Sequence, residues 1–115
     1  MAKDDYHVLV FKILAFLYRK LKNQTNILPE NYIVPLTSDF PVDADYLNYV
    51  IEQLVSEGYI DQVLMQKAWG GDLVYMDISR ARITPKGIEY LKDNSTMKQL
   101  ASKIEEGKFI ISLFN

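Results

Sequence analysis

The sequence predicts a small α+β domain, and three observations carry that prediction. Residues 43–57 have apolar side chains at three- and four-residue spacing, the pattern of an amphipathic helix: Leu47, Val50, Ile51 and Leu54. Gly58 follows, where a left-handed closing residue is favoured, and residues 59–68 and 73–83 flank Gly70 and Gly71, which favour a tight turn. A helix followed by a hairpin is typical of a winged-helix-like domain. We therefore expect a three-helix core, a β-hairpin wing and extra C-terminal helices.

Length and composition limit the classes of protein to consider. The 115 residues are 49% hydrophobic, enough for one domain, expected over residues 1–106, with an apolar tail over residues 107–115. The formal net charge of −2 gives no overall attraction to nucleic acid or to an acidic membrane. The absence of cysteine excludes disulfides and thiolate metal sites. Acidic residues precede the first apolar ones and no apolar run could cross a bilayer, so we expect a cytoplasmic protein without a membrane partner.

Residues 6–22 form the first predicted helix, which has a broad apolar stripe: Tyr6, Leu9, Val10, Ile13, Leu14, Leu17 and Leu21. Lys12, Arg19 and Lys22 fall near the opposite side and form its basic side. Additional apolar residues beside the stripe predict that this helix is covered on more than one side.

A connector follows over residues 23–35, where turn-forming residues are frequent and residues 32–34 could add a short strand to the hairpin. Residues 36–40 can form only about one helical turn before Pro41. A helix-turn-helix needs a full second helix to brace the third. The short segment therefore weakens an interpretation as a reader of DNA sequence.

The outward face of the third predicted helix, residues 43–57, is acidic and carries the main candidate site: Asp45, Asn48, Tyr49, Glu52, Gln53 and Ser56. Residues 23–66 contain seven acidic residues and no Lys or Arg. Proteins that read the major groove normally neutralise phosphates with basic residues near the recognition helix. Three interpretations remain: a solvated acidic face, a protein-docking face centred on Tyr49, or groove reading by Asn48 and Gln53.

The predicted hairpin carries the opposite charge. Its candidate nucleic-acid contacts are four basic residues and a tryptophan near the tip: Lys67, Trp69, Arg80, Arg82 and Lys86. In winged helices the wing can contact phosphate or the minor groove. The same charges could instead keep a sheet edge soluble.

Two further helices are predicted after the hairpin. Thr84 and Pro85 supply an N-cap and a first helical residue. Residues 93–95 break this helix, and Thr96 with Gln99 can form a capping box for the last one. The tail then exposes five large apolar residues, which would pack back on the first helix or form a homodimer: Phe109, Ile110, Ile111, Leu113 and Phe114.

The segment ITPKGIEYLKDNSTMKQL resembles the C-terminal signature of the YjcQ family, small winged-helix-like proteins of Gram-positive bacteria and their phages. The matching residues are Ile83, Thr84, Gly87, Tyr90, Leu91, Asn94, Ser95, Met97 and Lys98. An LxxEGYI element over residues 54–60 accompanies it and is common to many winged helices, and the resemblance spans residues 6–104. It implies a winged-helix-like α+β fold and a phage or prophage setting, and it transfers no catalytic residues.

No constellation of residues indicates catalysis. His7 is the only histidine, and neither a nucleophile nor an orienting carboxylate is marked beside it. Gly70-Gly71 lacks a phosphate-binding pattern. We therefore expect no catalytic, cofactor or metal site. Two functions remain: an interaction module that docks a protein through the third helix, or a DNA-binding regulator that uses the wing and the basic side of the first helix.

Overall fold

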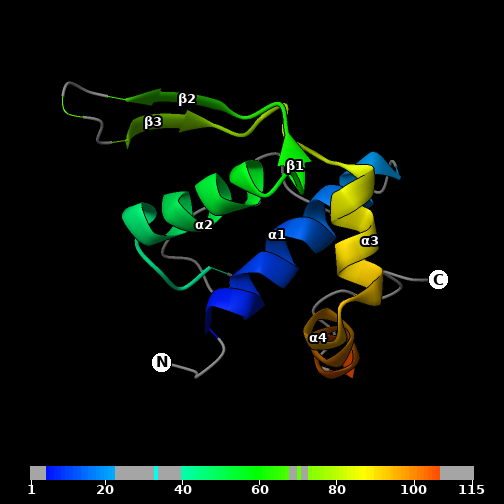
Figure 1. Ribbon diagram of the computed structural model, residues 1–115. Coiled ribbons are helices and arrows are strands. Elements are labelled where there is room, and N and C mark those ends of the chain that lie inside the picture. The colour runs from blue at the N-terminus through cyan, green and yellow to red at the C-terminus, as the bar shows by residue number, and fades with distance from the viewer. Residues whose placement is uncertain (1–4, 23–32, 34–39, 68–69, 71–72, 107–115) are drawn as a thin grey trace.

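The computed structural model shows a mostly helical α+β fold (Figure 1). It describes residues 5–22, 33, 40–67, 70 and 73–106. These contain four helices and four short strands: α1 (Asp5–Leu21), α2 (Ala44–Ser56), β1 (Ile60–Asp61), β2 (Leu64–Lys67), β3 (Leu73–Asp77), β4 (Arg82–Ile83), α3 (Pro85–Asp93) and α4 (Ser95–Glu106). No helix in this part of the chain has the length and apolar character needed to span a bilayer. The predicted tail lies outside the described residues. The same holds for residues 32 and 34 of the predicted short strand and for residues 36–39 of the predicted helical turn.

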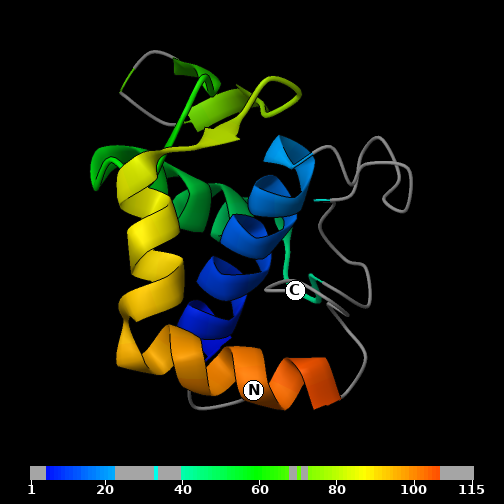
Figure 2. The same cartoon turned by 90° about the vertical axis from the view of Figure 1, so that its right-hand side faces the viewer.

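α1 is the centre of the core. It contacts α2, α3, α4 and β4, and Figures 1 and 2 show the other helices arranged around it. Its residues 9–17 are buried with the exception of Lys12, which is half-buried. This confirms that the helix is covered on more than one side.

The predicted basic side of α1 is partly wrong, because Arg19 is only 6% exposed. Phe16 lies one turn earlier on that side, and Phe40 packs on it with ring centroids 5.8 Å apart. Phe40, which follows the connector in sequence, therefore covers a side that periodicity alone marked as solvent-facing. Among the described atoms, the Arg19 Nε has no hydrogen-bond partner.

α2 forms as the sequence predicts. The Asp43 carboxylate caps its start by accepting a hydrogen bond from the Tyr46 amide at 2.9 Å. The predicted apolar stripe is buried: Leu47, Val50, Ile51 and Leu54. At the other end Gly58 has a φ of +81°, and the Tyr59 amide donates to the Leu54 carbonyl at 3.0 Å. The helix therefore ends in the left-handed closure expected of this glycine.

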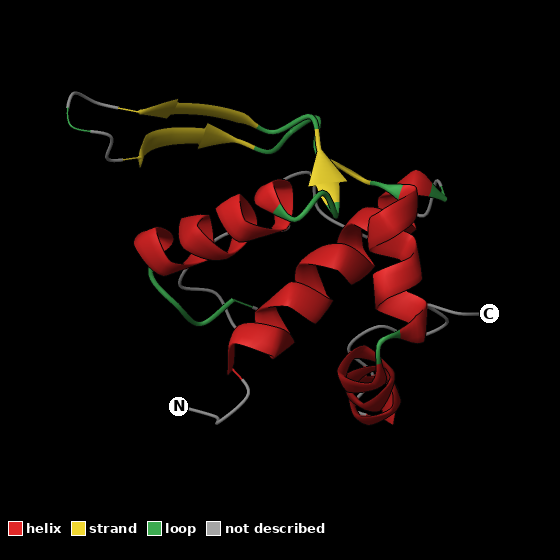
Figure 3. Cartoon of the chain, viewed as in Figure 1, coloured by secondary structure: helices red, strands yellow, loops and turns green. Residues whose placement is uncertain are grey.

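The two long hairpin strands predicted over residues 59–68 and 73–83 are each interrupted. β1 pairs with β4 next to the helices, and β2 pairs with β3 in a separate sheet that extends away from α3 and α4 (Figure 3). Gln62 breaks the first strand with a φ of +63°. On the returning strand the Asp77 carboxylate accepts a hydrogen bond from the Ser79 amide at 2.9 Å. The backbone therefore turns after β3 and the strand pairing is interrupted before β4.

A register shift between Gln66 and Lys67 pairs Lys67 with Leu73 at the end of the described ladder. Of the predicted turn at residues 69–72, the structure describes only Gly70. Gly70 has the positive φ that was predicted, at +92°, while Gly71 lies outside the described residues.

Thr84 joins the end of α2 to the start of α3. Its hydroxyl donates to the Gly58 carbonyl at 2.6 Å and accepts from the Gly87 amide at 3.0 Å. Its own amide donates to the Tyr59 carbonyl at 3.0 Å. The predicted N-cap is confirmed, and the same side chain also ties together two segments far apart in sequence.

Thr84→Val should therefore cost about 1–2 kcal/mol of unfolding free energy, because it leaves the Gly87 amide and the Gly58 carbonyl without this partner. Thr84→Ser keeps the hydroxyl and is the matched control. Urea unfolding of both variants measures the difference. Equal stability of the valine and serine variants would contradict this role of the hydroxyl.

The start of α4 differs from the predicted capping box at Thr96. Asn94 is the cap, because its side-chain oxygen accepts from the amides of Thr96 at 3.0 Å and Met97 at 3.1 Å. α3 ends at Asp93 and α4 begins at Ser95, so a single residue lies between the two helices. Met97 then enters the core with no exposed surface.

Candidate protein-interaction surface

The outward face of α2 is accessible to solvent. Asp45, Tyr49 and Ser56 are exposed, whereas Asn48, Glu52 and Gln53 are half-buried. Tyr49 is 53% exposed, which is unusual for so large an aromatic side chain. The fold thus keeps all six candidate residues on one side of a single helix, as the periodicity predicted.

Two of the candidate basic residues, Arg82 and Lys86, each contact another described residue. Arg82 Nε lies 3.3 Å from Asp61 Oδ1, in an exposed ion pair between β4 and β1. Lys86 Nζ donates to the Glu57 carbonyl at 2.8 Å, at the C-terminal end of α2. Arg80 is exposed, and the side chains of Lys67 and Trp69 lie outside the described residues.

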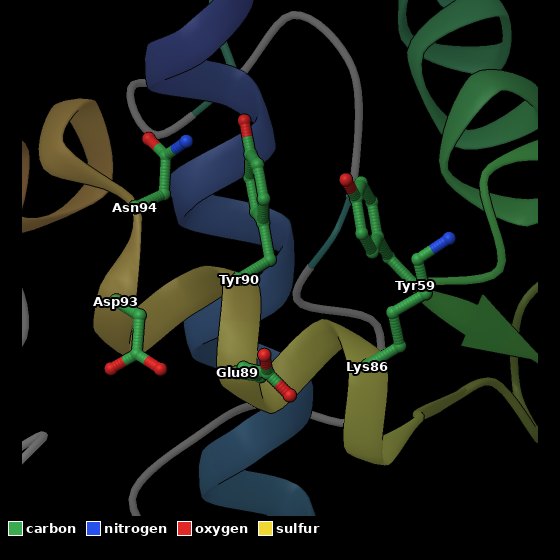
Figure 4. A pocket seen from close by; sticks show the side chains of 6 residues that line it. All are labelled: Tyr59, Lys86, Glu89, Tyr90, Asp93 and Asn94. Atoms are coloured by element: carbon green, nitrogen blue, oxygen red, sulfur yellow. The ribbon is translucent and has the colours of Figure 1, made fainter.

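A pocket of about 340 Å³ lies where the end of α2 meets α3 (Figure 4). Its lining combines two aromatic rings, a lysine, two carboxylates and an amide: Tyr59, Lys86, Glu89, Tyr90, Asp93 and Asn94. The rings of Tyr59 and Tyr90 are stacked, with centroids 4.5 Å apart and planes inclined by 23°. Lys86 Nζ lies 5.3 Å from the centre of the Tyr59 ring.

Sequence reasoning missed this pocket because its two rings come from opposite sides of the hairpin. Tyr59 directly follows the closing glycine of α2, and Tyr90 lies on α3. The Thr84 hydrogen bonds bring these segments together, and no local pattern predicts those contacts. The one available signal was the pair of carboxylates, Glu89 and Asp93, at four-residue spacing.

Electrostatic neighbours connect the pocket with α2. Burial, then the neighbouring Tyr59 and Glu57, raises the pKa of Tyr90 above 10.0. The pKa of Tyr6, at the start of α1, is also raised, first by burial and then by tyrosines of both neighbouring helices, including Tyr49 and Tyr90. Both phenols are therefore harder to ionise than a free tyrosine.

Other candidate chemistry has little support in geometry. His7 is exposed, and its ring stands at 89° to the Tyr6 ring, with centroids 5.5 Å apart. Within residues 5–22, 40–67 and 73–106, no three His, Cys, Asp or Glu side chains are placed to hold a metal ion. The predicted dimerisation residues of the tail lie outside the described residues, so a homodimer remains a prediction.

Comparison with known proteins identifies one family. The family described as YjcQ protein matches residues 11–108, which is most of the chain. Comparison with curated proteins and with solved structures gives no match. Among the residues on which the resemblance rested, Thr84 joins α2 to α3, Asn94 caps α4, and Leu91 is fully buried. The chain belongs to the YjcQ family.

Proposed function

We propose that the protein is a non-enzymatic interaction module of winged-helix type, in a phage or prophage setting, that docks a protein partner through the outward face of α2. The observation that carries the proposal is the exposure of Tyr49 at the centre of an acidic helix face. A tyrosine supplies a large contact area with little loss of conformational freedom. Its acidic neighbour Asp45 would favour a basic partner.

The winged-helix part of this proposal is supported by the order of the elements. α2 closes at Gly58 and leads directly into an antiparallel hairpin, whose strands β2 and β3 run above α2 in the view of Figure 1, away from α3 and α4. α1 packs on α2, and α3 and α4 follow the hairpin. The division of the hairpin into two sheets is a departure from a simple wing.

The charge of α2 favours a protein over a duplex as the partner. A helix that enters the major groove approaches phosphates on both sides, and Asp45 would be repelled there. The nearby Lys86 is held by the Glu57 carbonyl and the Tyr59 ring, so it is directed toward the junction. An acidic face at a protein interface has no such penalty when its partner is basic.

The test is capture of a partner by the full chain from an extract of its host, followed by binding of the purified partner. The double variant Asp45→Lys/Tyr49→Ala should weaken binding at least roughly tenfold, because it reverses a charge and removes the central aromatic contact. Gln99→Ala, at an exposed position on α4, is the matched control. Equal binding by the face variant and the wild type would overturn the proposal.

The alternative is a DNA-binding regulator that contacts DNA through the hairpin and the first helix, with two-fold symmetry supplied by the tail. The exposure of Arg80 and the 59% exposure of Arg82 favour it. A salt titration with a labelled duplex separates the two functions. Specific binding that weakens steeply with salt would support the regulator, whereas no binding even at low salt would contradict it.

A further inference from the structure

The pocket between the end of α2 and α3 carries two carboxylates that no described cation neutralises. Glu89 and Asp93 are exposed and lie four residues apart, so they project from the same side of α3. Neither forms an ion pair with another described residue. Lys86 also lines the pocket, but its ammonium donates to the Glu57 carbonyl at 2.8 Å. Because like charges at this spacing repel, a cation bound between them would relieve an unfavourable interaction.

Tyr90 gives the same pocket an aromatic wall. Figure 4 shows Tyr59 on one side of Tyr90 and the side chains of Asp93 and Asn94 on the other. The Tyr59 ring already has a cation of the chain over it, since Lys86 Nζ lies 5.3 Å from its centre. In the described part of the chain, no lysine or arginine lies over the Tyr90 ring. The stack thus offers a second ring to a cation that comes from outside.

An aromatic ring beside carboxylates matches the chemistry of arginine better than that of lysine. A guanidinium is planar, stacks on tyrosine, and donates two parallel hydrogen bonds to a carboxylate, whereas an ammonium is a strongly hydrated point charge. A volume of about 340 Å³ is at the small end of ligand pockets. It would admit one long side chain more readily than a cofactor.

We propose that this pocket receives an arginine side chain from a basic segment of the protein partner. The inference rests on the proposed function and names the chemistry that the partner must present. Tyr59 directly follows the closing glycine of α2 and lines the pocket, so an extended segment bound along α2 could reach the pocket. The acidic α2 face would accept either basic residue, whereas the pocket selects arginine. The position of the arginine in the segment therefore sets how the segment aligns along α2.

The probe for this inference is a pair of peptides of equal charge, nona-arginine and nona-lysine, titrated into the full-length protein at about 0.15 M salt. The wild type should bind nona-arginine at least roughly tenfold more tightly than nona-lysine. Glu89→Gln/Asp93→Asn should remove that preference. Tyr90→Leu should reduce it while leaving both carboxylates in place. Thermal unfolding of each variant checks that the fold is intact, which is expected because Glu89 and Asp93 are exposed.

The matched control is Asp45→Asn/Glu52→Gln, which removes two carboxylates from the α2 face instead. It should weaken both peptides and leave the arginine preference unchanged. Equal affinity of the wild type for the two peptides would overturn the pocket proposal, as would an arginine preference that survives Glu89→Gln/Asp93→Asn. Either result leaves docking through α2 intact if Asp45→Lys/Tyr49→Ala still loses the captured partner. The converse result is also distinguishable. If the wild type prefers nona-arginine but Asp45→Lys/Tyr49→Ala still binds the captured partner normally, docking through α2 is overturned and the pocket proposal is not.

Discussion

Replacing Gly87 with alanine should destabilise the protein by about 3 kcal/mol, because there is no room for a side chain at this position. A Cβ atom on Gly87 would overlap the Tyr59 carbonyl oxygen and approach Ile83 Cγ1 to 2.7 Å. The carbonyl belongs to backbone that is already fixed, since it accepts a hydrogen bond from the Thr84 amide at 3.0 Å. The first turn of α3 would have to move away from β1, and the hydrogen bonds of Thr84 would lengthen with it.

Urea and thermal unfolding measure this effect. The midpoint of thermal unfolding should fall by roughly 10 °C in a chain of this size. Glu89→Ala is the control on the same helix, since its side chain is exposed, and it should change stability by less than about 0.5 kcal/mol. A loss below about 1 kcal/mol for Gly87→Ala would show that α3 can shift without cost, contrary to the tight contact at Tyr59.

The parts of the fold that could be predicted from the sequence are those set by local patterns. The α2 stripe, the left-handed Gly58 and the Thr84 cap each depend on residues within one or two helical turns of one another. The α2 face was predictable for the same reason, because helical periodicity assigns Asp45 and Tyr49 to the side opposite Leu47.

The features that could not be predicted depend on contacts between distant segments. The hairpin breaks at Gln62, a residue with no intrinsic preference for a positive φ, and at the turn that the Asp77 carboxylate makes with Ser79. The pocket depends on Thr84, whose hydrogen bonds to Gly58 and Tyr59 hold the Tyr59 segment next to α3. Neither the breaks in the hairpin nor the pocket can be predicted from the alternation of residue types along a strand.

The core role of Phe40 was hidden for a related reason. It lies between the connector and Pro41, where no periodic pattern exists to mark it as buried. In the structure Phe40 has no exposed surface, and its ring packs on Phe16 of α1. Its carbonyl also accepts from the Val42 amide at 2.8 Å, one residue before the Asp43 cap of α2. Phe40 therefore anchors the chain at the point where α2 begins.

Phe40→Ala should accordingly cost about 4 kcal/mol of unfolding free energy, through lost burial and the cavity left against α1. Phe40→Leu retains most of the apolar volume and should cost less than about 1.5 kcal/mol. If the fold survives, hydrogen exchange should accelerate at the Tyr46 and Leu47 amides, which bond to Asp43 at the start of α2. Unchanged exchange of the Tyr46 and Leu47 amides would mean that Asp43 holds the start of α2 without the packing of Phe40. Faster exchange would show that the buried Phe40 positions the acidic end of the proposed docking face.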